Sequence, residues 1–272
     1  KSFFLFPLII WNLKRKFMKL AEQYDIKAAY FLSLNEKIFL TPLLLQRNIP
    51  VTWVEHQELR NWFLKNPWLW LYKKYAKSVQ IVPIGKNNFR VLEKLGVPNT
   101  SLHEILHGID KSLPQMQRHT KKNLIVTANR DIPKKGISDL NRAIEILKRK
   151  DLEVLIINDF LKKENWYDLL LKADVYVNPA RDRSETFSLN SAEALGAGCK
   201  LVVTNCSGIA DYLGNYEHAF IVEPQNPKDL ARGIMQALSA PEQIRSNARK
   251  HAKKYFDLSR SLKQFQSVIL RS

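Results

Sequence analysis

Cysteine is scarce in this chain of 272 residues, which contains only Cys199 and Cys206. Two thiols cannot supply a disulfide framework or a four-cysteine zinc site. The composition therefore excludes the small disulfide-rich class and fits a reducing compartment. We interpret both cysteines as small core or loop residues.

Long hydrophobic runs are also missing. No uninterrupted apolar segment reaches the roughly 18 residues of a membrane-spanning helix. The best candidate, Phe3–Leu13, is followed by Lys14, Arg15 and Lys16. Because these charges follow the apolar run instead of preceding it, the segment is not typical of a signal peptide.

Acidic residues are few relative to basic ones: 26 Asp and Glu stand against 43 Lys and Arg, which gives a formal net charge of +17. Such a balance favours a polyanionic partner, namely nucleic acid, an anionic membrane surface or a phosphorylated substrate. The apolar fraction of 45% is enough to bury two cores.

Short apolar runs alternate with helical patterns, which predicts an α/β fold with parallel sheets. The expected strands are Ala28–Leu32, Val51–Val54, Val79–Val82, Leu124–Ala128, Glu153–Ile157, Val175–Asn178, Leu201–Thr204 and Ala219–Val222. The expected helices include Ile137–Lys150, Trp166–Lys172, Leu189–Ala197 and Pro227–Leu238.

The polar stretch Lys111–Lys122 separates these runs into two groups, and we interpret it as the connection between two domains. We expect an N-terminal domain over residues 1–112 and a C-terminal domain over residues 113–256. A final helix over residues 257–272 is expected to pack back toward the N-terminal domain.

Aromatic and basic residues are interleaved in Phe3–Lys19 and Arg60–Tyr75, and residues 1–77 hold five of the six tryptophans. Trp, Tyr, Lys and Arg are favoured where a protein meets an anionic membrane. The alternative is that these aromatics fill the domain core. Single-stranded nucleic acid could also bind such a surface, but no recognisable nucleic-acid motif accompanies it.

The segment after the expected strand Val175–Asn178 carries the most specific signal. Residues 180–187 form a polar loop at the carboxyl end of a parallel strand, where ligands bind in α/β sheets. Ser188 is a good N-cap for a following helix, whose free N–H groups favour phosphate. Glu185 precedes this helix start, and Glu193 lies just inside the helix, where a carboxylate suits a sugar diol.

This segment resembles the EX7E signature of the retaining glycosyltransferases of family 4, which have the GT-B fold of two Rossmann-like domains. Further similarities to that family occur in Asn129–Gly136, His107–Asp110, Asn205–Asp211 and Asn226–Leu238. The resemblance covers roughly residues 50 to 256 and is stronger in the C-terminal domain.

The resemblance implies how a nucleotide diphosphate sugar would be held. Arg130 and Lys135 would clamp the diphosphate, a task suited to cations. The backbone around Phe187, Ser188 and Leu189 would bind the same phosphates.

The resemblance also implies contacts to the sugar and the acceptor. Glu185 would contact the donor sugar and Glu193 the ribose hydroxyls, while His56 would lie near the sugar and the acceptor. The reaction implied is sugar transfer to a hydroxyl with anomeric retention. We expect a glycan or lipid-linked acceptor, and a cytoplasmic enzyme that is peripheral on the inner face of the membrane.

No Asp-x-Asp sequence occurs, so we expect no divalent metal on the diphosphate and no cofactor besides the donor substrate. Arg130 and Lys135 would take the place of the metal. Simple solvated loop bases are the alternative reading of both residues.

Two departures from the family pattern limit the resemblance. The expected opening strand with a glycine-rich loop is missing, so we expect an incomplete N-terminal domain. The segment Asn158–Asn165 leads almost directly into the next helix, which leaves the nucleotide base unassigned. Two alternatives stay open: a sugar-nucleotide-binding subunit that is inactive without a second subunit, and a sugar-nucleotide epimerase of the same fold.

Overall fold

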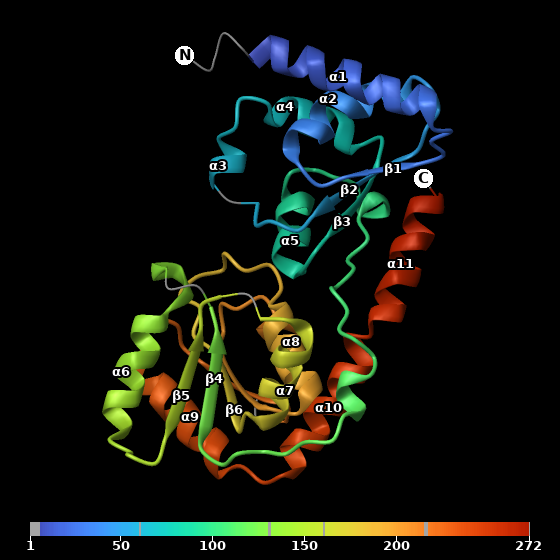
Figure 1. Cartoon of the computed structure of the whole chain (residues 1–272). Coiled ribbons are helices and arrows are strands. Elements are labelled where there is room, and N and C mark those ends of the chain that lie inside the picture. The colour runs from blue at the N-terminus through green and yellow to red at the C-terminus, as the bar shows by residue number, and fades with distance from the viewer. Residues whose placement is uncertain (1–5, 60, 130–131, 160, 215–216, 272) are drawn as a thin grey trace. The chain divides into compact units, whose positions relative to one another are not determined.

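The computed structural model describes residues 6–59, 61–129, 132–159, 161–214 and 217–271. It contains two compact units (Figure 1). The first comprises Lys1–Ile84, Asn88–Ile105 and Lys263–Ser272, and the second comprises Gly85–Asn87 and Leu106–Leu262. Each unit has a parallel sheet with helices, so the expected α/β class is confirmed.

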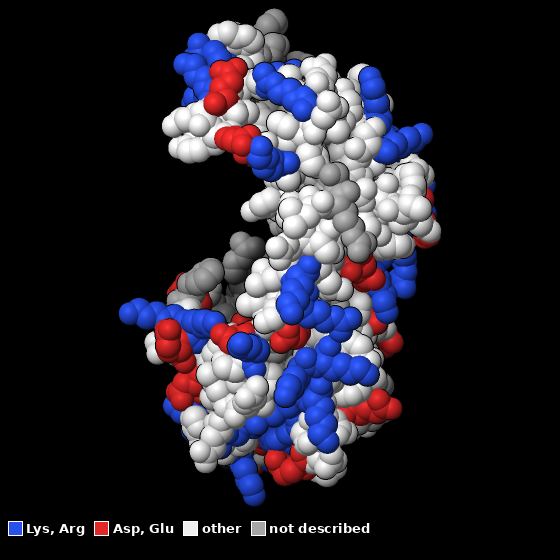
Figure 2. Space-filling model, turned by 90° about the vertical axis from the view of Figure 1, so that its right-hand side faces the viewer, with Lys and Arg blue, Asp and Glu red and all other residues white. Residues whose placement is uncertain are grey.

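Basic side chains are numerous on the surface of the protein (Figure 2). Lys and Arg side chains cover parts of both units on the face shown in Figure 2. Among the helices that the structure describes, none combines the length and the apolar character needed to cross a membrane.

The first unit has a three-stranded parallel sheet in the order β1-β2-β3. Its strands are β1 (Ala29–Phe31), β2 (Val51–Glu55) and β3 (Gln80–Pro83), which confirms the three strands predicted here. Its helices are α1 (Phe6–Gln23), α2 (Leu34–Leu45), α3 (Asn61–Leu64), α4 (Leu69–Ala76), most of α5 (Lys86–Lys94) and the end of α11 (Leu258–Arg271).

Aromatic residues fill the core of the first unit. The rings of Trp53 and Phe63 lie 4.7 and 4.8 Å from the ring of Tyr72, and all three side chains are buried. Aromatic packing of this kind adds to the stabilisation from burial alone. Part of the aromatic stretch 60–75 is therefore core, whereas Trp70 within it is exposed.

The second unit has a five-stranded parallel sheet in the order β5-β4-β6-β7-β8 (Figure 1). Its strands are β4 (Leu124–Ala128), β5 (Glu153–Ile157), β6 (Val175–Asn178), β7 (Lys200–Thr204) and β8 (Ala219–Val222). Its helices are α6 (Ile137–Leu147), α7 (Lys163–Lys172), α8 (Leu189–Ala197), α9 (Pro227–Ser239), α10 (Gln243–Tyr255) and the start of α11. All five strands confirm the sequence prediction.

Helices cover both faces of this sheet. Apolar residues of α6 and α9, such as Leu140 and Ile234, join Ile125, Val177 and Val202 of the strands in one buried cluster. Helix α8 packs against β6 and β7 and against α7 and α10. Because the strands are covered on both sides, they are nearly continuous apolar runs.

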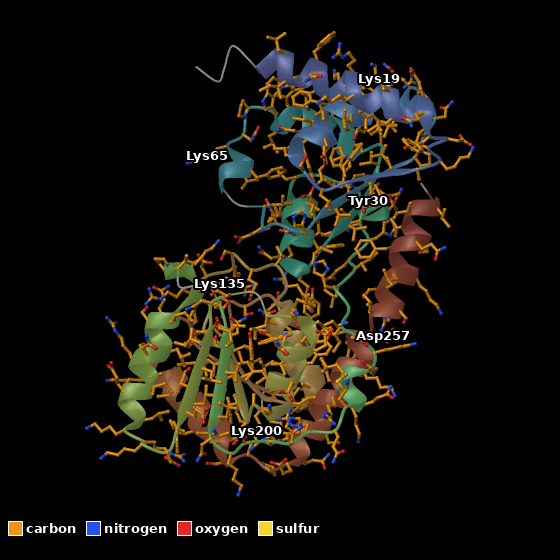
Figure 3. The ribbon with its side chains drawn as sticks, in the orientation of Figure 1. Lys19, Tyr30, Lys65, Lys135, Lys200 and Asp257 are labelled. Carbon is orange, nitrogen blue, oxygen red and sulfur yellow. The ribbon has the colours of Figure 1, made fainter. Side chains whose placement is uncertain are left out.

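The strand order reverses next to β4. The chain passes outward from β4 to β5 and then returns to the other side of β4 to form β6. The carboxyl ends of β4 and β6 therefore diverge into loops on opposite sides, which opens a crevice where α/β proteins bind ligands. Figure 3 places Lys135 at this end of the sheet and Lys200 at the other.

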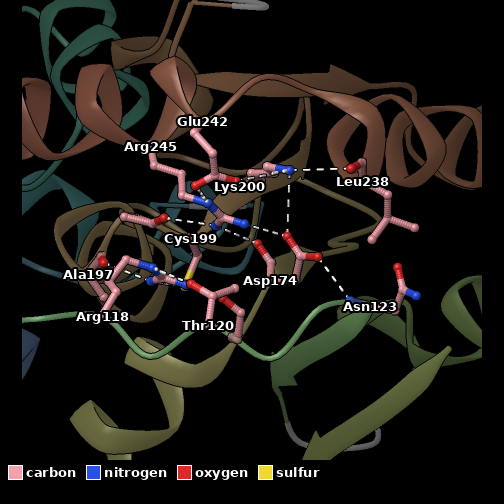
Figure 4. A network of polar contacts seen from close by, with 12 residues as sticks. Arg118, Thr120, Asn123, Asp174, Ala197, Cys199, Lys200, Leu238, Glu242 and Arg245 are labelled. Atoms are coloured by element: carbon pink, nitrogen blue, oxygen red, sulfur yellow. Dashed lines mark hydrogen bonds and ion pairs between the residues drawn. The ribbon is translucent and has the colours of Figure 1, made fainter.

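A buried charge network closes the opposite end of the sheet (Figure 4). The Asp174 carboxylate lies 2.5 Å from the Arg245 guanidinium and accepts the backbone N–H of Asn123 at 2.9 Å. Arg118 donates to the Ala197 carbonyl at 2.8 Å. The stretch 111–122, which we interpreted as a connection, is therefore anchored to the second unit.

Gly136 generates a test of the loop after β4. Its φ is +71°, and a Cβ atom there would come 1.8 Å from the backbone carbonyl oxygen of Pro179. Gly136→Ala is therefore expected to destabilise the second unit by more than the 1–2 kcal/mol, roughly, of left-handed backbone alone. Urea unfolding followed by fluorescence measures the change.

Gly198→Ala is the matched control. Gly198 also has a positive φ, +81°, but its nearest neighbours are side-chain atoms of Arg249, which can move. Equal losses for the two variants would contradict the close approach of Gly136 to the carbonyl oxygen of Pro179, directly after β6.

Candidate functional site

A close ion pair lies at the carboxyl edge of the second unit. The 3₁₀ turn η3 (Pro133–Lys135) follows β4 and positions Lys135, and the loop after β6 positions Glu185. The Nζ atom of Lys135 lies 2.7 Å from Oε1 of Glu185, and both side chains are largely buried. Residues predicted to contact the diphosphate and the sugar thus lie side by side.

Asn178 at the end of β6 holds the second oxygen of this carboxylate. Its Nδ2 donates to Oε2 of Glu185 at 2.8 Å, and Ser207 donates its hydroxyl to the same oxygen at 3.1 Å. Glu185 is therefore fixed from three sides. Sequence reasoning missed Asn178, although a buried strand that ends in an amide was a usable signal.

The amide of Asn178 also lies among three serine hydroxyls. Its Nδ2 is 3.0 to 3.1 Å from the Oγ atoms of Ser188, Ser191 and Ser207. An amide nitrogen has only two hydrogens, so these contacts cannot all be donated bonds at once. Within the described residues, Oδ1 of Asn178 has no hydrogen-bond partner. The site therefore rests on a buried cluster of Asn178 and three serines, whose hydroxyl hydrogens can reorient.

Helix α8 begins next to the ion pair. Ser188 is its N-cap and accepts the N–H of Ser191 at 3.4 Å, which confirms the predicted helix start. Phe187 is buried and packs 5.3 Å from the ring of Phe256, whereas Leu189 is partly exposed. First-turn N–H groups lack intrahelical acceptors and carry positive partial charge, so this end suits an anion.

The loop after β7 closes against the same segment. A Cβ atom on Gly208 would come within 2.2 Å of the Thr186 carbonyl oxygen and 2.6 Å of that of Glu185. Only glycine permits this approach. The predicted motif Asn205–Asp211 is thus packed on the backbone that carries Glu185.

Glu193 is held within α8 by two aromatic donors from α7. Trp166 donates its indole N–H to the carboxylate at 2.7 Å, and Tyr167 donates its hydroxyl at 3.3 Å. Burial is the largest cause that raises the pKa of Glu193 above its ordinary value of 4.5, and it likewise raises the pKa of Tyr167. Glu193 also lines a cavity of about 410 Å³ with Trp166 and Leu189.

His56 belongs to the first unit, where it lines a separate cavity of about 360 Å³. A buried ion pair lies in the same wall: Nζ of Lys37 is 2.8 Å from Oε1 of Glu55. Tyr72 donates its hydroxyl to that oxygen at 2.8 Å. Sequence reasoning missed this pair, because nothing in the local pattern marks Lys37 as buried.

The second unit therefore brings together most of the predicted residues. Those within it are Lys135, Glu185, Phe187, Ser188, Leu189 and Glu193. The predicted phosphate ligand Arg130 lies outside the described residues. Among the described residues, no group of three or more His, Cys, Asp or Glu side chains is arranged to hold a metal ion.

Two parallel α/β units, one with a basic and acidic site at its strand-order reversal, have the fold of the GT-B glycosyltransferases. Residues 156–255 match the family described as "Glycosyl transferases group 1". This segment runs from β5 to α10 and includes Glu185 and Glu193.

One curated protein with a similar sequence is a mannosyltransferase. The chain is 23% identical over 250 residues to the MMP alpha-(1->4)-mannosyltransferase of Mycolicibacterium hassiacum, and the match covers 79% of the chain. It spans 60% of the length of that relative.

Solved structures show the same fold. A glycosyltransferase from Rickettsia africae superposes with a TM-score of 0.82 at 17% identity, covering 97% of this chain and 82% of that one. Anabaena HepE in complex with UDP gives a TM-score of 0.82 at 15% identity, covering 96% and 82%.

The raised pKa of Glu193 generates a stability prediction. The folded state holds this carboxyl protonated to higher pH than the unfolded chain does, so the contribution of Glu193 to stability declines as pH rises above about 4.5. Relative to the parent, Glu193→Gln should therefore gain stability between pH 4 and pH 7. Urea unfolding at both pH values measures the gain.

Glu145→Gln serves as the control, because Glu145 is exposed on α6 and should show a smaller pH-dependent gain. A gain for Glu193→Gln that does not grow with pH would contradict the burial of a charged carboxylate.

Proposed function

We propose that this protein is a retaining glycosyltransferase of family 4, which transfers a sugar from a nucleotide diphosphate donor to a hydroxyl acceptor. The observation that carries the proposal is the 2.7 Å pair of Lys135 and Glu185 beside the start of α8. A cation, an open helix N-terminus and a fixed carboxylate are three groups that a diphosphate sugar needs.

Lys135 and the N-terminal turn of α8 would bind the diphosphate, with Arg130 as the second cation. Glu185, fixed by Asn178, would accept hydrogen bonds from hydroxyls of the donor sugar. Glu193 would accept those of the ribose. Lys135, Glu185, Glu193 and the start of α8 each offer a charge or dipole that the fold already holds in place, which lowers the cost of organising the site on binding.

The chemical step breaks the bond between the anomeric carbon and the phosphate oxygen, and the bonding electrons stay on that oxygen. The acceptor oxygen then bonds to the same face of the anomeric carbon, and its proton passes to the departing phosphate. Lys135 and the helix dipole stabilise the charge that develops on the diphosphate. No resident metal or cofactor is part of this proposal. For His56 we propose an acceptor-side role in the first unit's own cavity.

The acceptor is proposed to be lipid-linked or a polysaccharide at the cytoplasmic face of a membrane. Helix α1 supports this assignment. Its buried side packs Leu13 and Phe17 on the core, whereas Leu8, Ile9 and Trp11 are about 60% exposed. The same exposed side carries Arg15, Lys16 and Lys19. Apolar and basic residues on one helix face favour an anionic bilayer.

Donor turnover tests the proposal. Lys135→Met is expected to reduce release of nucleoside diphosphate from a panel of sugar nucleotides by about a hundredfold, because one stabilising cation is lost from the leaving group. Turnover is measured by a coupled phosphate assay with a hydroxyl-rich acceptor mixture.

Lys134→Met is the matched control, since Lys134 is exposed and adjacent in sequence. Equal activity of the two variants would overturn the assignment of Lys135. Donor binding without turnover by the parent would favour the partner-dependent subunit, and an isomerised sugar nucleotide formed without acceptor would favour the epimerase.

Membrane association is tested separately. Trp11→Glu is expected to reduce cosedimentation with phosphatidylglycerol vesicles several-fold, because it places a charge on the apolar face. Ile146→Glu, at an exposed apolar position on α6, should leave binding unchanged. Equal losses, or equal binding to neutral phosphatidylcholine vesicles, would contradict the proposed contact.

A further inference from the structure

The cavity beside Glu193 has the size and position of a nucleoside site. It measures about 410 Å³, which lies in the range of small-molecule pockets. Its walls come from the carboxyl ends of β4 and β5 and the first turns of α7 and α8, represented by Ala128, Ile157, Lys163 and Leu189. It therefore lies at the ligand-binding edge of the sheet.

The lining of this cavity combines a fixed carboxylate with apolar side chains. Trp166 donates its indole N–H to the Glu193 carboxylate at 2.7 Å. This bond orients the carboxylate that we propose to bind the ribose hydroxyls. Leu161 and Leu189 line the same cavity although 37% and 41% of their surfaces are exposed. Apolar side chains exposed at a cavity rim can cover the face of a base.

Two charged groups also line the cavity, and they differ in availability. Lys163 is paired with Asp110 at 2.7 Å, and their hydrogen bond raises the pKa of Lys163. Asp159, which is exposed, forms neither a hydrogen bond nor an ion pair with any residue that the structure describes. Its exposed carboxylate is therefore a charged acceptor open to a ligand, and the same cavity is lined by the amide of Asn190, which donates to the Ala128 carbonyl at 3.2 Å.

We propose that Asp159 selects guanine, so that the donor is a guanosine diphosphate sugar. The inference rests on the proposed function. Guanine presents N1–H and the N2 amino group side by side, and a carboxylate accepts both at once. Uracil presents one N–H between two carbonyl oxygens, which a carboxylate repels. Adenine and cytosine each present a single amino group.

Binding of free nucleoside diphosphates to the whole chain tests the proposal by calorimetry. GDP is expected to bind at least about tenfold more tightly than UDP, CDP or ADP, the scale of one bidentate base contact. Asp159→Asn should lose about tenfold in GDP affinity. It should gain affinity for xanthosine diphosphate, because xanthine replaces the amino group with a carbonyl that the asparagine amide can donate to.

Glu164→Gln removes a nearby charge on α7 that does not line the cavity, and it should keep the preference for GDP. UDP binding as tightly as GDP, or no change in Asp159→Asn, would overturn the inference and leave the proposed function standing. Failure of the parent to bind any of the nucleotides would overturn both. The gain for xanthosine diphosphate shows that the variant is folded.

Discussion

The reversal of strand order beside β4 is the constraint on which the candidate site depends. Because β4 is flanked by β5 on one side and β6 on the other, the connections that follow β4 and β6 run to opposite sides of the sheet. The first residues of the two loops nevertheless start next to each other at the sheet edge. Lys135 comes from the first loop and Glu185 from the second, and the two meet at 2.7 Å. No local sequence interaction could bring these residues together, since fifty positions separate them.

The charge network that anchors the chain and the candidate site lie at opposite ends of the second unit's sheet. At the amino end, the buried pair of Asp174 and Arg245 and the half-buried Arg118 tie strands, helices and the incoming chain together. At the carboxyl end, burial of Glu193 raises its pKa, and the side-chain carbonyl oxygen of Asn178 has no hydrogen-bond partner in the part of the chain that the structure describes. A buried carboxyl with a raised pKa and an unpaired polar atom both cost stability, and such features are common at ligand-binding sites.

Much of this arrangement could be predicted from the sequence. All eight strands were predictable because strands covered on both faces are short continuous apolar runs bounded by polar turns. Ser188 was predictable as a helix start because its cap chemistry is local. Lys135 and Glu185 could be singled out as candidate site residues because they belong to recognisable motifs, and the structure places their side chains side by side.

The contacts that support these residues were not predictable. The bond from Trp166 to Glu193 joins residues 27 positions apart, and that from Asn178 to Ser207 joins residues 29 apart. Such partners are set by the packing of helices and strands, and single-sequence patterns carry no record of it. Lys37 was missed for the same reason: a lysine in a helix is expected in solvent, and only the fold reveals Glu55 beside it.

The pairing of Lys135 with Glu185 has a consequence for how the site discriminates among anions. In the unliganded protein Lys135 and Glu185 already neutralise each other, so this pair by itself adds little net attraction for a bare phosphate. A molecule gains full affinity only by replacing both partners, with negative charge for the lysine and hydroxyl hydrogens for the glutamate. Under the proposed function, inorganic phosphate and neutral sugars would therefore compete weakly with the donor, because each of them replaces only one of the two partners.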